Sequence, residues 1–154
     1  MNEYIDAYVF LGMHSKDEPT RVACKNYFVE RLDDKVGMSL EQVGKCDDVI
    51  WQYSREAQDI YYPFMDNLHT VMDIERTPYH ERDIQEALTN PELQDLDISG
   101  RLTIGMALAR RATLYSVNPN LASSGLVSRP KDGEELTFPE ELEQLYRQSL
   151  GVRI

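Results

Sequence analysis

The chain has 154 residues, a formal net charge of −11 and a hydrophobic content of 42%, which favours one folded domain with its own core. No apolar run is long enough to form a membrane-spanning helix. The acidic balance is unfavourable for gripping duplex nucleic acid through its phosphates. It suits a basic protein or peptide partner instead.

The cysteines and the first residues of the chain bear on the cellular compartment of the protein. Cys24 and Cys46 lie far apart with no CxxC motif, a pattern typical of reduced thiols in a cytoplasmic protein. The first residues, Met1-Asn2-Glu3, are not basic, which argues against a signal peptide. We therefore expect a cytoplasmic protein.

Short apolar segments alternate with amphipathic stripes along the chain. Strands separated by helices predict an α/β fold with a mostly parallel central sheet flanked by helices, in which the first strand is central and parallel to the strand after the 97–111 helix. In chain order we expect a strand at 4–11, a helix at 19–32, a strand at 35–38, a helix capped by Ser39, a long helix at 55–75, helices at 79–88 and 97–111, a strand at 113–117, a last strand at 135–138 and a helix at 139–150.

Asp6 interrupts the most apolar stretch of the chain, which ends at Gly12. If this stretch is a strand buried on both faces, its carboxylate must be hydrogen-bonded, paired or metal-bound, because burying a bare charge is very costly. The alternative is that Asp6 hydrogen-bonds backbone amides at the start of a helix. The first interpretation makes Asp6 a candidate site residue.

Two further acids are candidates for the same site. Asp47 stands four residues after Val43 and three before Ile50, so we expect it on the inward face of the second helix. Asp97 opens the 97–111 helix. Asp47 could instead be a solvated neighbour of Asp48, and Asp97 is a natural N-cap.

The carboxyl edge of a parallel sheet is where strand ends and helix starts meet, so these three acids are expected to converge there. Clustered carboxylates repel one another and require a hard cation such as Mg²⁺ or Mn²⁺. Such ions can align and deprotonate a water and stabilise a leaving oxygen in phosphodiester cleavage. Asp6, Asp47 and Asp97 are thus the predicted catalytic and metal-binding residues.

Two stretches resemble the PIN-domain family. Residues 5–11 (IDAYVFL) are similar to the family's opening strand, and residues 97–118 (DISGRLTIGMALARRATLYSVN) are similar to its closing core. The resemblance covers about residues 4–120, and residues 121–154 are expected to be an extension within one PIN-like domain. It implies a three-layer PIN-like fold and an Mg²⁺-dependent ribonuclease ancestry, as in the toxins of toxin–antitoxin pairs.

The chain departs from the family pattern at three of four acids. The second acid would fall near Lys45, where Glu41, Asp47 or Asp48 would have to substitute. The third falls on Gly100, one turn after Asp97, and the fourth on the segment ending in Asn118, which would be a neutral metal ligand.

Two functions follow as hypotheses. The first is a metal-dependent ribonuclease that cleaves single-stranded or structured RNA. The second is a PIN-like module without catalytic activity that acts by binding a protein or peptide, and a homodimer is a further expectation left open.

Overall fold

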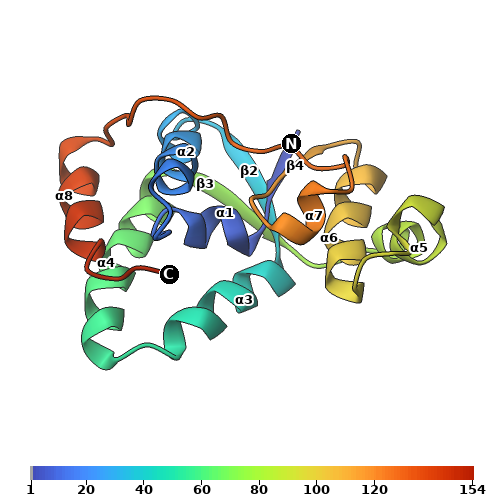
Figure 1. Ribbon diagram of the computed structural model, residues 1–154, viewed down its shortest axis with the longest axis horizontal. Helices are drawn as coiled ribbons and strands as arrows, with labels where there is room; N and C mark the ends of the chain where they lie inside the picture. Colours follow the sequence, from blue (N-terminus) through green and yellow to red (C-terminus); the bar gives the residue numbers. More distant parts are fainter. Residues whose placement is uncertain (1) are drawn as a thin grey trace.

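A four-stranded, fully parallel sheet forms the centre of the molecule (Figure 1). The computed structural model describes residues 2–154. The strands are β1 (Glu3–Ile5), β2 (Lys35–Ser39), β3 (Asp73–Thr77) and β4 (Thr113–Tyr115), in the order β3-β2-β1-β4. Tyr4 pairs with Gly37 on one side and Leu114 on the other. The predicted α/β class is confirmed, and so are the central position of β1 and its parallel pairing with β4.

Helices fill every connection between the strands and also follow the last strand. They are α1 (Ala7–Gly12), α2 (Glu18–Val29), α3 (Leu40–Trp51), α4 (Arg55–Val71), α5 (Glu81–Thr89), the 3₁₀ helix η1 (Pro91–Leu93), α6 (Ile98–Ala109), α7 (Pro119–Ala122) and α8 (Glu140–Ser149). The side chain of Ser39 accepts a hydrogen bond from the backbone N–H of Gln42, so the predicted cap of α3 is confirmed.

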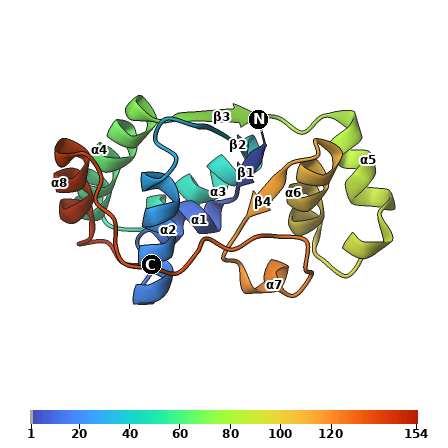
Figure 2. The same cartoon turned by 90° about the horizontal axis from the view of Figure 1, so that it is seen from above.

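The two faces of the sheet carry separate hydrophobic clusters. Successive strand residues point to opposite faces, and Ile5 joins the cluster of α1, α2, α4 and α8, whereas Tyr4 joins that of α6 and α7. The strand order is consistent with this division of the helices. Right-handed crossovers from β1 to β2 and from β2 to β3 place α1–α4 on one face of the sheet, and the connection from β3 back to β4 places α6 on the other face. Figure 2 shows α5, α6 and α7 at the opposite end from α4 and α8.

The predicted first strand is wrong in extent. β1 ends at Ile5, and Ala7–Gly12 forms the helix α1, with Asp6 as its N-cap. A short apolar run does not distinguish a strand from a buried helix turn, whereas Asp is a preferred cap residue. Asp6 therefore lies at the end of β1, where a parallel sheet places its sites.

The third strand was not predicted, and the helix expected at 55–75 is wrong beyond Val71. Residues Asp73–Thr77 form β3, which pairs with β2 along its whole length. Only Ile74 and Thr77 of this strand are buried. An edge strand with one apolar side chain shows too little alternation of apolar and polar residues for its sequence to be distinguished from the end of a helix.

The strand expected at 135–138 is wrong. This segment runs along α2 without entering a sheet. The side chain of Asn26 replaces a strand partner: its Nδ2 donates to the carbonyl of Glu134 at 2.8 Å, and its Oδ1 accepts from the N–H of Leu136 at 2.8 Å. Because these hydrogen bonds come from a side chain of α2, the sequence of residues 135–138 does not show that the segment lies outside the sheet.

Residues 130–154 complete the core instead of trailing from it. Phe138, Leu142, Tyr146 and Val152 belong to the cluster of α1, α2 and α4. The backbone N–H of Ile154 donates to the carbonyl of His14 at 2.8 Å. The C-terminal segment is therefore part of the same folded unit as the sheet.

Buried charges hold this segment to α2. Arg21 and Lys25 are 3% and 0% exposed. Glu135 accepts from Arg21 Nη2 at 2.7 Å and from Lys25 Nζ at 2.6 Å, and Glu143 also pairs with Lys25, at 2.9 Å. These bonds to two cations, with that of Arg21 foremost, lower the pKa of the Glu135 carboxyl to about 2.

Candidate functional site

The carboxyl ends of β1 and β4 meet where the strand order reverses, the position at which open parallel sheets form crevices. Asp6 follows β1 and Ser116 follows β4. The Ser116 hydroxyl donates to Oδ2 of Asp6, and the N–H of Val9 donates to Oδ1 at 3.1 Å. Asp6 is 1% exposed. Burial raises its pKa to about 6, even though these hydrogen bonds lower it.

A small polar pocket of about 80 Å³ opens beside Asp6. It collects side chains from α1, α3, α6 and the α7 region. Its lining consists of Asp6, Tyr8, Gln42, Lys45, Asp97, Ser99, Gly100, Thr103, Asn118, Asn120 and Leu121. Two of the three predicted acids, Asp6 and Asp97, and the predicted ligand Asn118 thus share one pocket.

The α3 side chains in this pocket are an amide and an ammonium. Gln42 Oε1 accepts from the N–H of Ala7 at 2.9 Å, and its Nε2 donates to Thr103 Oγ1 at 3.1 Å. Lys45 Nζ donates to Ser99 Oγ at 2.5 Å. Lys45 therefore brings a positive charge into the pocket, where a divalent cation would need carboxylates.

Asp97 and Asn118 both act as helix caps. Asp97 Oδ1 accepts from the N–H of Gly100 at 2.7 Å, and Asn118 Oδ1 accepts from the N–H of Asn120 at 3.0 Å. Asp97 is exposed. The N-cap interpretation of Asp97 holds in the structure, and the same carboxylate faces the pocket.

Asp47 lies elsewhere, so the prediction that it faces inward with the other acids is wrong. It is exposed. Its Oδ1 accepts from the Tyr62 hydroxyl at 3.2 Å, and it lines a different pocket, between α3 and α4. On α3, Ile50 is buried and Val43 and Cys46 are partly buried against the core, whereas Asp47, next to Cys46, faces solvent.

The other two acids of this region also point away from Asp6. Glu41 Oε1 accepts from the Tyr79 hydroxyl at 2.6 Å. Asp48 is exposed and lines a third hollow, with Tyr8 and Lys45 at its edge. No acid of α3 joins the pocket of Asp6 and Asp97.

These residues do not fit an Mg²⁺ or Mn²⁺ centre. Such a centre needs several oxygen ligands with negative charge, and this pocket offers two carboxylates, one of them engaged by Ser116 and Val9, together with the Lys45 ammonium. Within residues 2–154, no group of three or more His, Cys, Asp or Glu side chains is placed to hold a metal ion.

Sequence reasoning did not find Gln42, Thr103 and Ser116 as pocket residues. Gln42 stands three residues after the Ser39 cap, and an amide on the inward side of a helix start is a signal of a polar contact. Ser116 follows β4 directly, as Asp6 follows β1, so the shared sheet edge was the signal that could have identified it.

The fold and pocket define an α/β protein with a parallel four-stranded sheet and a polar site at its carboxyl edge. The chain belongs to a family of unknown function (DUF6190), whose sequence pattern matches residues 1–154. No curated protein matches the chain. None of the helices in residues 2–154 is both long enough and apolar enough to cross a bilayer.

Replacing Lys45 by an acid tests the charge argument directly. We expect Lys45→Glu to gain Mn²⁺ binding, because a third carboxylate joins Asp6 and Asp97 and the ammonium is removed. Free Mn²⁺ at about 100 times its Kd would stabilise the fold by about 2.7 kcal/mol, a rise in Tm of roughly 5–10 °C.

The measurement is a thermal melt with and without Mn²⁺. Lys16→Glu, which makes the same charge change at an exposed position outside the pocket, is the matched control and should not respond. A Mn²⁺ shift of equal size in the wild type, Lys45→Glu and Lys16→Glu would contradict the role given to Lys45.

Proposed function

We propose that the chain is a PIN-like binding module that recognises a basic protein or peptide partner. The observation that carries the proposal is the Lys45 ammonium among Asp6, Gln42 and Ser99, in the pocket where the ribonuclease hypothesis requires acids. Inside the pocket Gln42 pairs with Thr103 and Lys45 with Ser99, as expected of polar groups that stabilise the fold. The partner then binds elsewhere on the surface.

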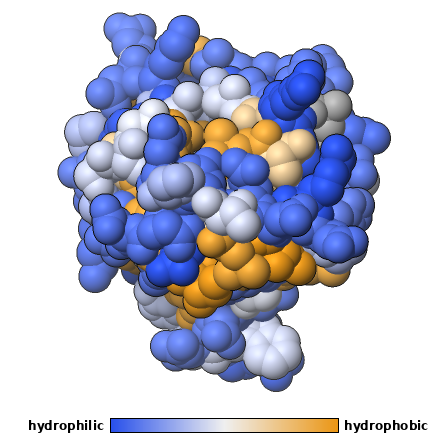
Figure 3. Space-filling model, turned by 90° about the vertical axis from the view of Figure 1, so that its right-hand side faces the viewer, coloured by the Kyte–Doolittle hydropathy of each residue, from blue (hydrophilic) through white to orange (hydrophobic). Residues whose placement is uncertain are grey.

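The end of the molecule formed by α5 and α6 presents large apolar side chains to solvent. Ile84 and Leu88 of α5 are 42% and 57% exposed, and Ile98 at the start of α6 is 56% exposed. Figure 3 views this end and shows hydrophobic atoms gathered in continuous areas among polar ones. Exposed apolar patches with a polar rim are typical of protein interaction sites.

The segment that carries this apolar face is predominantly acidic, with the exposed Arg82 as the one basic residue between positions 81 and 97. Between residues 81 and 97 the chain carries Glu81, Glu86, Glu92, Asp95 and Asp97 in addition to Asp83, which is buried and paired with Arg110 at 2.6 Å. A partner with lysines or arginines around apolar residues complements such a surface. A second copy of the chain would bring the same charge of −11, so a basic partner fits better than a homodimer.

The α5–α6 rigid pair is a suitable platform for such contact. A Cβ on Gly105 would lie 3.0 Å from the backbone N of Ala87 and 3.1 Å from the carbonyl of Asp83, so the two helices pack backbone to backbone. This close packing fixes Ile84 and Leu88 on the outer side, which lowers the entropy lost on binding.

The test is cross-linking in cells with the tagged chain, its Ile84→Glu/Leu88→Glu variant and a Trp51→Glu control. Trp51 is 71% exposed and lies at the end of α3, away from α5 (Figure 1). We expect a basic protein that is cross-linked to the wild type and the control and lost from the α5 variant. The same cross-linked proteins with all three chains would contradict the proposal.

A metal-dependent ribonuclease is the second candidate. It is favoured by the convergence of Asp6, Asp97 and Asn118 on one pocket at the carboxyl edge. The Lys45 ammonium and the distant position of Asp47 count against it. Cleavage of RNA by the purified chain, discussed below, separates the two candidates.

A further inference from the structure

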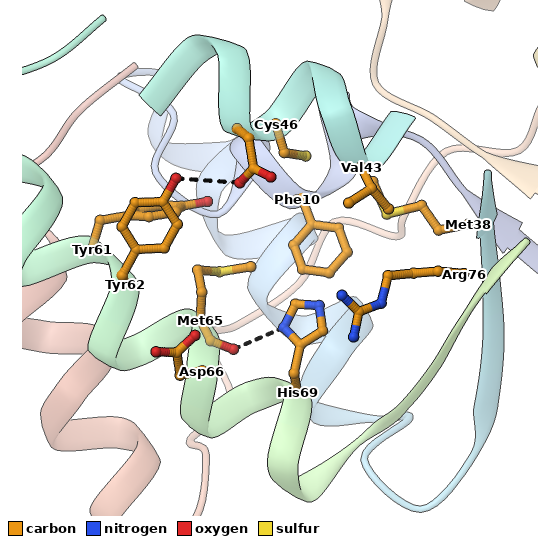
Figure 4. A pocket seen from close by; sticks show the side chains of 11 residues that line it. Phe10, Met38, Val43, Cys46, Tyr61, Tyr62, Met65, Asp66, His69 and Arg76 are labelled. Atoms are coloured by element: carbon orange, nitrogen blue, oxygen red, sulfur yellow. Dashed lines mark hydrogen bonds between the residues drawn. The ribbon is translucent and has the colours of Figure 1, made fainter. Parts of the chain in front are cut away.

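A second pocket, of about 240 Å³, lies between α3, α4 and the sheet, on the opposite side of α3 from Lys45. Its floor and walls are apolar. Around the rim lie two acids, an arginine and a histidine. Its full lining is Phe10, Met38, Val43, Cys46, Asp47, Tyr61, Tyr62, Met65, Asp66, His69 and Arg76 (Figure 4).

One buried polar atom in this pocket has no partner. The Tyr61 side chain is 2% exposed, and among residues 2–154 its hydroxyl finds no hydrogen-bond partner. Figure 4 shows this hydroxyl extending from α4 into the pocket, on the side of Cys46. Burial raises the pKa of Tyr61 well above its usual value, so the group stays a neutral hydroxyl that can donate or accept. A buried hydroxyl left unpaired destabilises the fold, and a bound ligand that hydrogen-bonds it would remove this penalty.

The acidic side of the pocket is built by Asp47 and Asp66. Asp47 is held by the Tyr62 hydroxyl at 3.2 Å, and Figure 4 shows Tyr62 and Asp66 on the same side as Tyr61. Two carboxylates next to tyrosine rings and a free hydroxyl are the groups that recognise an ammonium.

The opposite side carries Arg76. The acids beside Arg76 on β3, Asp73 and Glu75, form ion pairs with Lys35 at 3.8 and 3.3 Å. Within residues 2–154, Arg76 itself forms no ion pair. Beside it, His69 stacks on Phe10 with ring centroids 5.7 Å apart. Because the Met65 carbonyl can only accept, His69 Nδ1 at 2.8 Å must carry a proton. A guanidinium without a protein partner at a pocket mouth suits a carboxylate.

The apolar floor joins these two sides. Phe10, Met38, Val43 and Met65 contribute no hydrogen-bonding side-chain group beyond weakly accepting sulfurs, so the middle of a ligand must be hydrocarbon. The volume is at the small end for ligand sites, which excludes nucleotides and other large cofactors.

We propose that this pocket binds a small amino carboxylate, with an ammonium at one end, a carboxylate at the other and a short apolar chain between them. The ammonium lies between Asp47, Asp66 and the Tyr61 hydroxyl, and the carboxylate pairs with Arg76. This site is independent of the α5–α6 surface and of the Lys45 pocket.

The probe is 6-aminohexanoate, compared with hexylamine and hexanoate by calorimetric titration into the full chain. We expect the zwitterion to bind at least tenfold more tightly than either singly charged compound, since charged hydrogen bonds contribute at both ends. Equal binding of hexylamine, or no binding of any of the three, would overturn the proposal.

Variants locate the binding on named groups. We expect Tyr61→Phe to weaken 6-aminohexanoate binding about fivefold and Arg76→Gln to weaken it at least tenfold. Tyr61→Phe should be at least as stable as the wild type, because the lost hydroxyl has no partner and its removal takes away an unsatisfied buried group. Arg76 is exposed, so both variants should fold. Tyr8→Phe, an exposed tyrosine outside this pocket, is the control. Unchanged affinity in Tyr61→Phe and Arg76→Gln would refute the assignment.

Discussion

Glu135→Gln is expected to destabilise the fold by about 3 kcal/mol, the lower part of the range for breaking a buried ion pair. Glu135 binds Arg21 and Lys25 together, and both cations are almost completely buried. The neutral amide leaves two buried positive charges with less compensation. Glu143 still pairs with Lys25 at 2.9 Å, which keeps the expected loss at the lower end.

The measurement is urea unfolding of the wild type, Glu135→Gln and Glu134→Gln. The last is the matched control, because Glu134 is exposed and contributes only its backbone carbonyl to the contact with Asn26. A second change, Lys25→Met, should recover part of the loss in Glu135→Gln, since it removes one of the stranded charges. Equal stability of the two single variants would contradict the buried network.

Acid is expected to destabilise the protein through His14. This side chain is fully buried, and Nε2 hydrogen-bonds the Ser149 hydroxyl at 2.8 Å. Burial, aided by Arg153 and Arg21, lowers its pKa from 6.5 to about 3. The unfolded chain therefore binds the proton first as the pH falls below 6.5, so stability is lost between pH 6.5 and 3, by up to about 5 kcal/mol.

Asp6 acts in the opposite direction over a narrower range. Its pKa is raised from 3.8 to about 6, so the folded state takes up the proton first. Its contribution to stability is present below pH 3.8 and is lost as the pH rises to 6, by up to about 3 kcal/mol. Because the shift of His14 is larger, the sum of the two still favours the folded state at neutral pH over pH 4 or below.

Unfolding free energies at pH 7 and pH 4 for single variants separate the two groups. Going from pH 7 to 4, the wild type should lose about 3 kcal/mol more than His14→Gln does, whereas Asp6→Asn should lose more than the wild type. His80→Gln, at an exposed position, should follow the wild type. A pH dependence that is identical in His14→Gln and the wild type would refute the assignment.

The sequence was sufficient to predict the fold class because alternation of strands and helices is encoded locally. Ser39, for example, marks the start of α3 with its own side chain. β3 was missed because its strand character comes from pairing with β2, and Ile74 alone does not signal it. The segment at 135–138 was assigned wrongly because Asn26, more than a hundred residues away, supplies its hydrogen bonds.

The candidate site was predicted in part. Asp6 and Asp97 were placed on one sheet edge by topology, and they do line one pocket. The position of Asp47 was predicted wrongly because helix periodicity locates the buried face of a helix only to within about one residue. Asp47 lies next to the partly buried Cys46, and that small difference places its carboxylate on the solvent side of α3. The pairing of Lys45 with Ser99 depends on tertiary contact between α3 and α6 and leaves no sequence pattern.

The sequence alone did not identify the side chains of either proposed binding surface. Tyr61 and Tyr62 are adjacent on α4, and adjacent tyrosines on one helix cannot both face inward. The structure buries Tyr61 and leaves Tyr62 at the rim of the pocket. The exposed apolar face of α5 could not be predicted from the sequence, because the packing of α5 against α6 determines that Ile84 and Leu88 face solvent.

Cleavage of single-stranded RNA in Mn²⁺, by the wild type and Asp6→Asn side by side, is the most direct test of the claim that the chain is a binding module without a metal centre. The account predicts that neither protein cleaves any of several RNAs above the background without protein. Mn²⁺-dependent cleavage by the wild type that Asp6→Asn abolishes would contradict it, and would identify the pocket of Asp6 and Asp97 as a nuclease site.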